Sequence, residues 1–191
     1  MSDIIQQTVL NKSRKDKFLF TLNLPNALKN KNSSTERDDR KINLDSLQFS
    51  VFGTVIPKIE KPAVEIRYSG NTLYNSAHSI NSYPPVTVNF TIDNRFNNYW
   101  AVYSWLNLMH DQVEGIYDKE GSIIDGKFEN YQADLILTTL DEFDKPVVFF
   151  TYTKAFPVEL GEVELNYRNP EEITCSFTFV YSQLKLNLAK I

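Results

Sequence analysis

The sequence predicts a mainly β domain: an antiparallel β-sandwich or small barrel with one flanking α-helix. Apolar and polar residues alternate over most of the 191-residue chain, and a spacing of two is typical of strands. Helical spacing occurs once, in the middle of the chain at residues 94–113. A single mid-chain helix among antiparallel strands favours this architecture.

The first part of the chain predicts an arm and then the start of one domain. Residues 1–16 are expected to form an N-terminal arm, and residues 17–191 a single β domain. The first strand is expected at 18–24, where Pro25 ends the alternation. Residues 26–46 are mostly polar and charged, which predicts a long exposed loop, an uncommon feature that is often functional.

Alternation continues on both sides of the helix. Before it, strands are expected at 47–51, 64–68 and 86–92. After it, strands are expected at 133–137, at 147–152, in a run that begins at Pro157 and includes Val163 and Leu165, and finally at 173–181.

The helix is expected to begin after Asp93 or Asn94, either of which is a suitable N-cap. Its aromatic residues recur at steps of three and four, so we expect them on the buried side. The predicted core residues are Phe90, Phe96, Trp100, Tyr103, Phe177 and Phe179.

No catalytic, metal or cofactor site is predicted. Cys175 lies in an apolar alternating run and is expected to be a small buried residue. His78 lies in a polar loop, and His110 at a helix end, where a polar or cationic side chain is favourable. The carboxylates Asp141, Glu142 and Asp144 lack the spacing of a calcium loop, and we expect a charged hairpin tip there instead.

Charge and hydropathy argue against further classes of protein. A net charge of −4 argues against a protein that mainly grips phosphates. No run has the length of a membrane span, and the N-terminus lacks the layout of a signal peptide. We therefore expect synthesis in the cytoplasm and no membrane partner.

Two expected strands, 86–92 and 173–181, each carry one apolar face and one face of Thr, Ser and Asn. The last strand has few charged or proline guards before Lys185. Bare strand edges of this kind pair with other chains. The sequence therefore predicts edge-to-edge joining of identical subunits.

Three segments carry a resemblance to a known family. They are FGTVIPKIEKPAVEIRYSGNTLY at 52–74, VTVNFTIDNRFNNYWAVYSWLN at 86–107, and FPVELGEVELNYRNPEEITCSFTFVYSQ at 156–183. In order and spacing they resemble the tail tube proteins of contractile-tailed phages, with kin in type VI secretion and contractile injection tubes. The resemblance covers roughly 17–183, and the long polar loop departs from it.

The resemblance implies a non-enzymatic structural subunit that forms hexameric rings, whose inner strands complete a ring-wide β-barrel. The rings would stack into a hollow tube, with sheath and baseplate proteins as partners. DNA or a tape-measure protein would pass through the lumen without specific binding. The location implied is the tail of a virion assembled in the host cytoplasm.

Two groups of residues follow as site predictions. The expected lumen-facing residues are Thr87, Asn89, Thr91, Thr174, Ser176 and Thr178. The expected contacts between rings are Lys31, Glu36, Arg37, Asp38, Asp39, Arg40, Asn71 and Tyr74.

Three other functions fit parts of the sequence. A baseplate protein that initiates the tube would share the fold and cap one ring. A carbohydrate-binding β-sandwich would need Trp100 and Trp105 exposed for stacking on sugars, and we expect at least Trp100 to be buried. A small hydrolase would use His110 or His78.

Overall fold

A computed structural model describes residues 12–25, 28, 50–77, 79, 82–109, 131–168 and 170–189. Within these ranges the chain is mainly β with one helix, as the sequence predicts. The elements are β1 (Phe18–Leu22), β2 (Val51–Thr54), β3 (Ala63–Tyr68), β4 (Asn71–Ser76), β5 (Val86–Thr91), α3 (Asn97–Met109), β6 (Ala133–Leu140), β7 (Pro146–Leu160), β8 (Thr174–Val180) and β9 (Gln183–Leu188).

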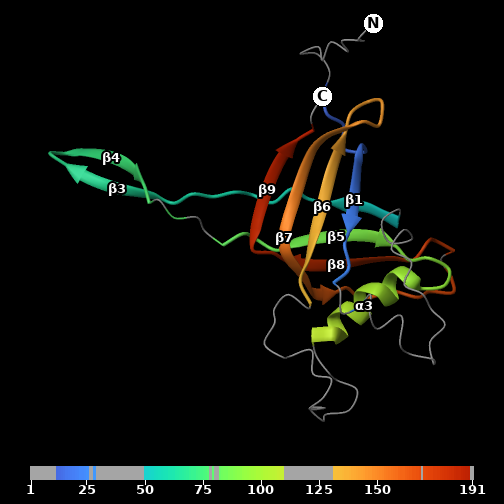
Figure 1. Ribbon diagram of the computed structural model, residues 1–191. Helices are drawn as coiled ribbons and strands as arrows, with labels where there is room; N and C mark the ends of the chain where they lie inside the picture. The colour runs from blue at the N-terminus through green and yellow to red at the C-terminus, as the bar shows by residue number, and fades with distance from the viewer. Residues whose placement is uncertain are drawn as a thin grey trace, which may run out of the picture.

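All strand pairs are antiparallel, and those of the body fall into two layers that share β7. Sheet A contains β1, β6, the first part of β7 and β9. Sheet B contains residues 156–160 of β7, then β8, β5 and β2. Figure 1 shows the strands of sheet A crossing those of sheet B, so the body is a β-sandwich.

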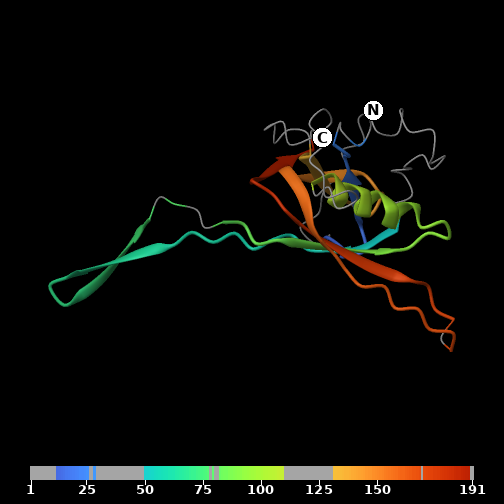
Figure 2. The same cartoon turned by 90° about the horizontal axis from the view of Figure 1, so that it is seen from below.

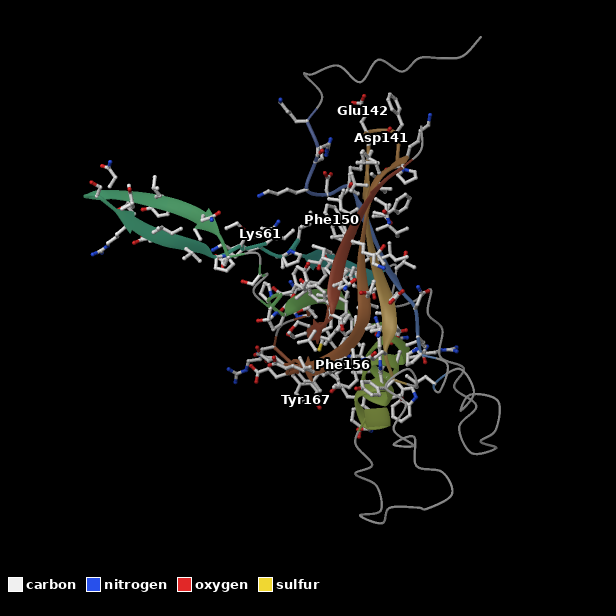
Figure 3. All side chains as sticks on the ribbon, turned by 60° about the vertical axis from the view of Figure 1, so that its left-hand side comes forward. Lys61, Asp141, Glu142, Phe150, Phe156 and Tyr167 are labelled. Atoms are coloured by element: carbon white, nitrogen blue, oxygen red, sulfur yellow. The ribbon has the colours of Figure 1, made fainter. Side chains whose placement is uncertain are left out.

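Strand β7 changes sheets at Lys154 and Ala155. Lys154 has a φ of 54°, and its amide donates to Asp134 Oδ1 at 3.0 Å. A left-handed residue bends the strand, and Ala155 turns into the core, where it is fully buried. Figure 3 shows Phe150 and Phe156 on the two sides of this bend.

The core lies between the two sheets and is closed by α3, which lies against β7. Sheet A contributes Phe20, Leu22, Leu135, Leu137 and Tyr152, sheet B contributes Val86, Val88, Phe90, Phe177 and Phe179, and α3 contributes Ala101, Val102 and Trp105. The Trp105 indole N–H donates to the Tyr131 carbonyl at 2.7 Å, which fixes the helix over the end of the sandwich.

The β3–β4 hairpin forms a separate two-stranded sheet. Figures 1 and 2 show it projecting far from the body on extended linkers. Every residue of both strands is exposed.

Several expected boundaries are wrong. Instead of ending at 152 and restarting at Pro157, β7 runs through that proline, which sits at a bulge between Pro157 and Glu159. Prolines are tolerated at bulges because no ladder hydrogen bond is required there. Residues 161–166, which include Val163 and Leu165, follow β7 without strand pairing. Strand β9 was not expected, although Leu184, Leu186 and Leu188 alternate along it.

The helix and the polar loop also differ from expectation. The helix begins at Asn97, not 94, because residues 94–95 form a turn and Phe96 has a φ of 58°. Leu28 falls inside the loop expected to be exposed, yet it is buried, and its amide donates to the Pro25 carbonyl at 3.1 Å. The rest of the 26–46 loop, apart from Leu28, and residues 110–113 of the expected helix lie outside the described residues.

Candidate functional site

The six residues expected to face a lumen share one face of sheet B. Strand register places them directly opposite one another in the pairs Thr87–Thr178, Asn89–Ser176 and Thr91–Thr174. This is the face turned away from the core, because Val88, Phe90, Phe177 and Phe179 between them are buried. We call these six residues the polar face.

The polar face is small and uncharged. The hydroxyls of Thr87 and Thr178 lie 3.1 Å apart and hydrogen bond. Strands β2, β5 and β8 contain no charged residue at all. Residues 156–160 of β7 add one carboxylate, Glu159, whose register partner is Thr178. The surface therefore has hydroxyl and amide groups but no cation that would bind phosphate.

Two glycines, Gly161 and Gly53, lie close to residues of the polar face. The Gly161 amide donates to the Ser176 carbonyl at 2.7 Å, and a Cβ on Gly161 would lie 2.7 Å from Ser176 Oγ. A Cβ on Gly53 would lie 3.2 Å from Asn89 Nδ2. Glycine at these positions permits close packing beside the polar face.

Both edges of sheet B are open in the described part of the chain. On one side, β2 has β5 as its strand partner. On the other, residues 156–160 of β7 pair with β8. Phe52, in the bulge of β2, is 55% exposed. Unpaired edges with an exposed aromatic side chain are surfaces for joining another chain.

The expected core residues divide into two groups. Phe90, Phe177 and Phe179 are buried, and Phe90 and Phe177 pack with ring centroids 6.0 Å apart. Phe96 and Tyr103 are 38% and 40% exposed, so their expected burial is wrong, and Trp100 is half-buried.

The buried stripe of α3 is instead made by Asn98, Ala101, Val102 and Trp105. Small residues let the helix approach β7 closely. The side-chain amide Nδ2 of the fully buried Asn98 donates to the Thr91 carbonyl at 2.7 Å and to Ser50 Oγ at 3.0 Å. The Asp93 carboxylate accepts the Asn97 amide at 2.7 Å and so caps the helix. In this orientation Phe96 and Tyr103 point outward.

Of the residues expected between rings, Asn71 and Tyr74 lie on β4 of the projecting hairpin, and both are exposed. Lys31, Glu36, Arg37, Asp38, Asp39 and Arg40 lie outside the described residues.

The described residues offer little reactive chemistry. Cys175 is buried, as expected, and burial raises the pKa of its thiol. Asp141 binds the Phe143 and Lys145 amides at 2.8 Å each and so forms the β6–β7 turn. His78 and His110 are not among the described residues. Across the described ranges, no group of three or more His, Cys, Asp or Glu could hold a metal ion.

Two tyrosines, the buried Tyr152 and the half-buried Tyr181, sit where the sheets meet. Burial raises the pKa of both Tyr152 and Tyr181, that of Tyr181 to about 12 with a smaller contribution from Tyr83. Tyr83 stacks on Tyr181 with ring centroids 5.3 Å apart. These phenols are neutral below pH 10 and act as packing groups.

Two further observations bear on the alternatives. No helix in the described segments is long and apolar enough to span a membrane. Trp105 is 1% exposed, which removes one of the two aromatic platforms that a sugar-binding surface would need.

Comparisons with known proteins agree with the resemblance found in the sequence. The model of a family described as "phage tail tube protein" matches residues 13–187. Among curated proteins, none matches the sequence significantly.

Solved structures share the fold at low identity. A tube-terminating cap of the anti-feeding prophage matches at 14% identity and a TM-score of 0.60, covering 99% of this chain and 100% of that one. A chain of the sheath–tube complex of an extracellular contractile injection system matches at 11% identity and a TM-score of 0.58, covering 95% of each chain. A chain of the anti-feeding prophage baseplate matches at 12% identity and a TM-score of 0.56, covering 94% of this chain and 98% of that one.

Proposed function

We propose, since the chain belongs to the phage tail tube protein family, that it is a structural subunit whose copies close into hexameric rings and stack into a hollow tube. One observation carries the proposal: sheet B ends in two open edges, β2 on one side and residues 156–160 of β7 on the other. The sheet is a finished layer only when another strand covers each edge.

The two edges are different surfaces, so a contact between them is heterologous. A heterologous contact forms a ring when its rotation closes. Pairing β2 of one copy with residues 156–160 of the next gives every edge a partner and creates a barrel that runs around the ring. Obligate contacts of this type bury about 2,000 Å² or more.

In such a barrel the polar face lines the channel, because the opposite face of sheet B is occupied by the core. Thr87, Asn89, Thr91, Thr174, Ser176 and Thr178 then present hydroxyl and amide groups to the cargo, with Glu159 as the charged neighbour. DNA phosphates meet no cation on these strands and are not held. DNA or a tape-measure protein would pass through without specific binding.

The helix lies on the core side of sheet B, so its exposed aromatic residues face away from the channel. Sheath and baseplate proteins are the proposed outer and end partners, by analogy with the assemblies named for the similar structures. The proposed location is the tail of a virion assembled in the host cytoplasm. The subunit has no proposed catalytic role, cofactor or membrane partner.

The expected ring-to-ring contacts remain a proposal. Asn71 and Tyr74 are available for it on the exposed hairpin. Lys31, Glu36, Arg37, Asp38, Asp39 and Arg40 are proposed for the same role from the sequence alone.

A tube-initiating or tube-ending subunit is the second candidate. The cap and baseplate chains are as similar in fold as the chain from the sheath–tube complex. An initiator forms one ring and stops, whereas a tube subunit forms stacks.

The test is sedimentation velocity with negative-stain electron microscopy of the purified chain over a range of concentrations. We expect rings that stack into tubes as the concentration rises. Rings that never stack would favour the initiator. A monomer at every concentration would overturn the proposal.

A further inference from the structure

The core-facing side of sheet A continues beyond the part that packs in the core. Strand register arranges this side in three rows, each crossing β1, β6, β7 and β9. Residues directly opposite one another on antiparallel strands share a face, so every member of these rows is on the same side as the core. The rows are Leu22–Leu135–Tyr152–Leu184, Phe20–Leu137–Phe150–Leu186 and Phe18–Thr139–Val148–Leu188.

Exposure rises along these rows toward one corner of the sheet. The first row is buried on β1, β6 and β7. In the second row Phe150 is half-buried and Leu186 is 57% exposed, and in the third Val148 is half-buried and Leu188 is 71% exposed. We call these four residues the leucine corner. Figure 1 shows this end of sheet A, with the β6–β7 turn, extending past sheet B.

The pattern of β9 is that of a strand with one covered face. Its three leucines alternate with Gln183, Lys185 and Asn187, which are polar and exposed. Strict alternation is typical of a strand that faces water on one side only. The contiguous apolar surface of the leucine corner therefore marks an interaction site.

The start of β1 lies at the same end of sheet A as the leucine corner. Just before β1, the Lys17 carbonyl accepts the Leu140 amide at 3.0 Å, and Lys17 Nζ pairs with Asp144 Oδ1 at 2.6 Å in the β6–β7 turn. The end of β9 is fixed there too, because the Ala189 amide donates to the Val147 carbonyl at 2.9 Å. Residues 1–11, which lie outside the described residues, therefore join the body at this end.

Residues 1–11 carry apolar side chains within a polar sequence, namely Ile4, Ile5, Val9 and Leu10. Strands β1 and β9 lie three strand spacings apart, about 14 Å. An extended chain advances about 3.3 Å per residue, so the stretch from Leu10 to Lys17 can span about 23 Å. Covalent attachment also gives this segment an effective concentration on the order of millimolar at the corner, which favours it over a second copy.

We infer that the apolar side chains of residues 4–10 cover the leucine corner of their own chain. The cover is intramolecular, so the inference does not depend on ring formation. It assigns the N-terminal arm a role in shielding sheet A. With this apolar surface removed from water, association of copies is confined to other surfaces, such as the open edges of sheet B.

An engineered disulfide tests which chain supplies the cover. The variant combines Leu10→Cys with Leu188→Cys, and the two single substitutions are its controls. The native Cys175 is buried and does not compete. After mild oxidation, we expect non-reducing electrophoresis and peptide mass spectrometry to show a disulfide within one chain in the double variant. A disulfide formed only between chains would assign the cover to a second copy and overturn the inference. The absence of any disulfide joining residues 10 and 188 would overturn it too.

Charges introduced into the arm test the same contact without a crosslink. The arm variant combines Ile5→Asp with Val9→Asp, and the matched control places the same charges between them, Gln6→Asp with Thr8→Asp. Circular dichroism and thermal melting confirm that the body is folded. In the arm variant we expect stronger binding of a dye that reports apolar surface, and about tenfold faster hydrogen exchange at the β9 amides.

The control should match the wild type in both measurements, because Gln6 and Thr8 are polar already. Equal dye binding and equal exchange in the arm variant and the control would overturn the inference. Neither result bears on ring closure, which is measured separately by sedimentation of the wild-type chain. The inference and the proposed function can therefore fail independently.

Discussion

The β5–β8 pair and the β3–β4 hairpin are both antiparallel pairs of short strands with alternating side chains, yet their environments are opposite. In β5–β8 every second residue is buried against the other sheet and the helix. In β3–β4 the corresponding apolar residues are exposed. The difference teaches that alternation specifies a two-faced strand pair but not what covers its apolar face, which is the molecule's own core in one case and, we propose, another copy in the other.

Hydrogen exchange should separate the two regions by the largest effect. Amides of β5 and β8 open only with the core, whereas those of β3 and β4 open locally. In the unassembled chain we expect exchange at β5 and β8 to be at least about 1,000-fold slower than at β3 and β4. Mass spectrometry or NMR measures the rates. Equal protection would mean that the hairpin is stable alone, which would break the comparison.

Truncating one large apolar residue in each region is the next test. Phe177→Ala should cost about 3–5 kcal/mol of unfolding free energy, because Phe177 is buried among Phe90 and Phe179. Ile66→Ala should cost less than about 0.5 kcal/mol in the unassembled chain, because Ile66 is exposed. Urea denaturation gives both values. Similar costs for the two variants would show that the hairpin packs within its own chain.

A glycine pair tests the close packing beside the polar face. In Gly161→Ala the added Cβ meets Ser176 Oγ at 2.7 Å and the Ser176 backbone oxygen at 3.1 Å. We expect a cost of about 1–3 kcal/mol. Gly53→Ala is the matched control, since its Cβ meets the Asn89 side chain at 3.2 Å and that side chain can move. We expect less than about 1 kcal/mol there, and the reverse order would contradict the described register.

Alkaline pH should destabilise the fold partly through Tyr181, which directly follows β8. The folded state raises the pKa of Tyr181 to about 12, above the unfolded value of about 10. The stabilisation from its neutral form is therefore complete below about pH 10 and is lost as pH rises toward 12. Melting temperatures measured from pH 8 upward should fall less steeply for Tyr181→Phe than for the wild type. The exposed-tyrosine control, Tyr74→Phe, should follow the wild type, and an unchanged slope in Tyr181→Phe would contradict the burial of this phenol.

The sequence predicts much of the body because local pattern and burial agree there. Val86, Val88 and Phe90 alternate with Thr87 and Asn89, and the structure places the two sets on opposite faces of β5. The same holds for β8, and the turn at 141–144 follows from its Asp residues.

The wrong strand and helix boundaries have physical causes that cannot be read from the alternation of apolar and polar residues. Pro157 usually ends a strand, but the bulge after it removes the need for its missing N–H. The aromatic spacing of the helix predicts the wrong buried face. The buried face carries Asn98, whose side-chain amide hydrogen bonds to Thr91 and Ser50, together with Ala101, Val102 and Trp105. The only hint in the sequence was the Asn98 side chain itself, and an asparagine within a helix is weak evidence that its face is buried.

The sequence likewise predicts one part of the candidate site and misses another. Strand register brings the six residues of the polar face together as the alternation predicts. The unpaired segment that follows β7 was missed, because residues 162–165 alternate like a strand while the structure leaves them unpaired. Whether another chain covers an apolar face or a strand edge is not encoded in any one segment of the sequence.

A near-atomic electron cryo-microscopy map of the assembled protein would show how the open edges of sheet B are covered. We expect β2 of each copy to hydrogen bond to residues 156–160 of the next, with the polar face lining the channel. A map in which copies join without strand pairing at these edges, or in which the polar face points away from the channel, would contradict this expectation.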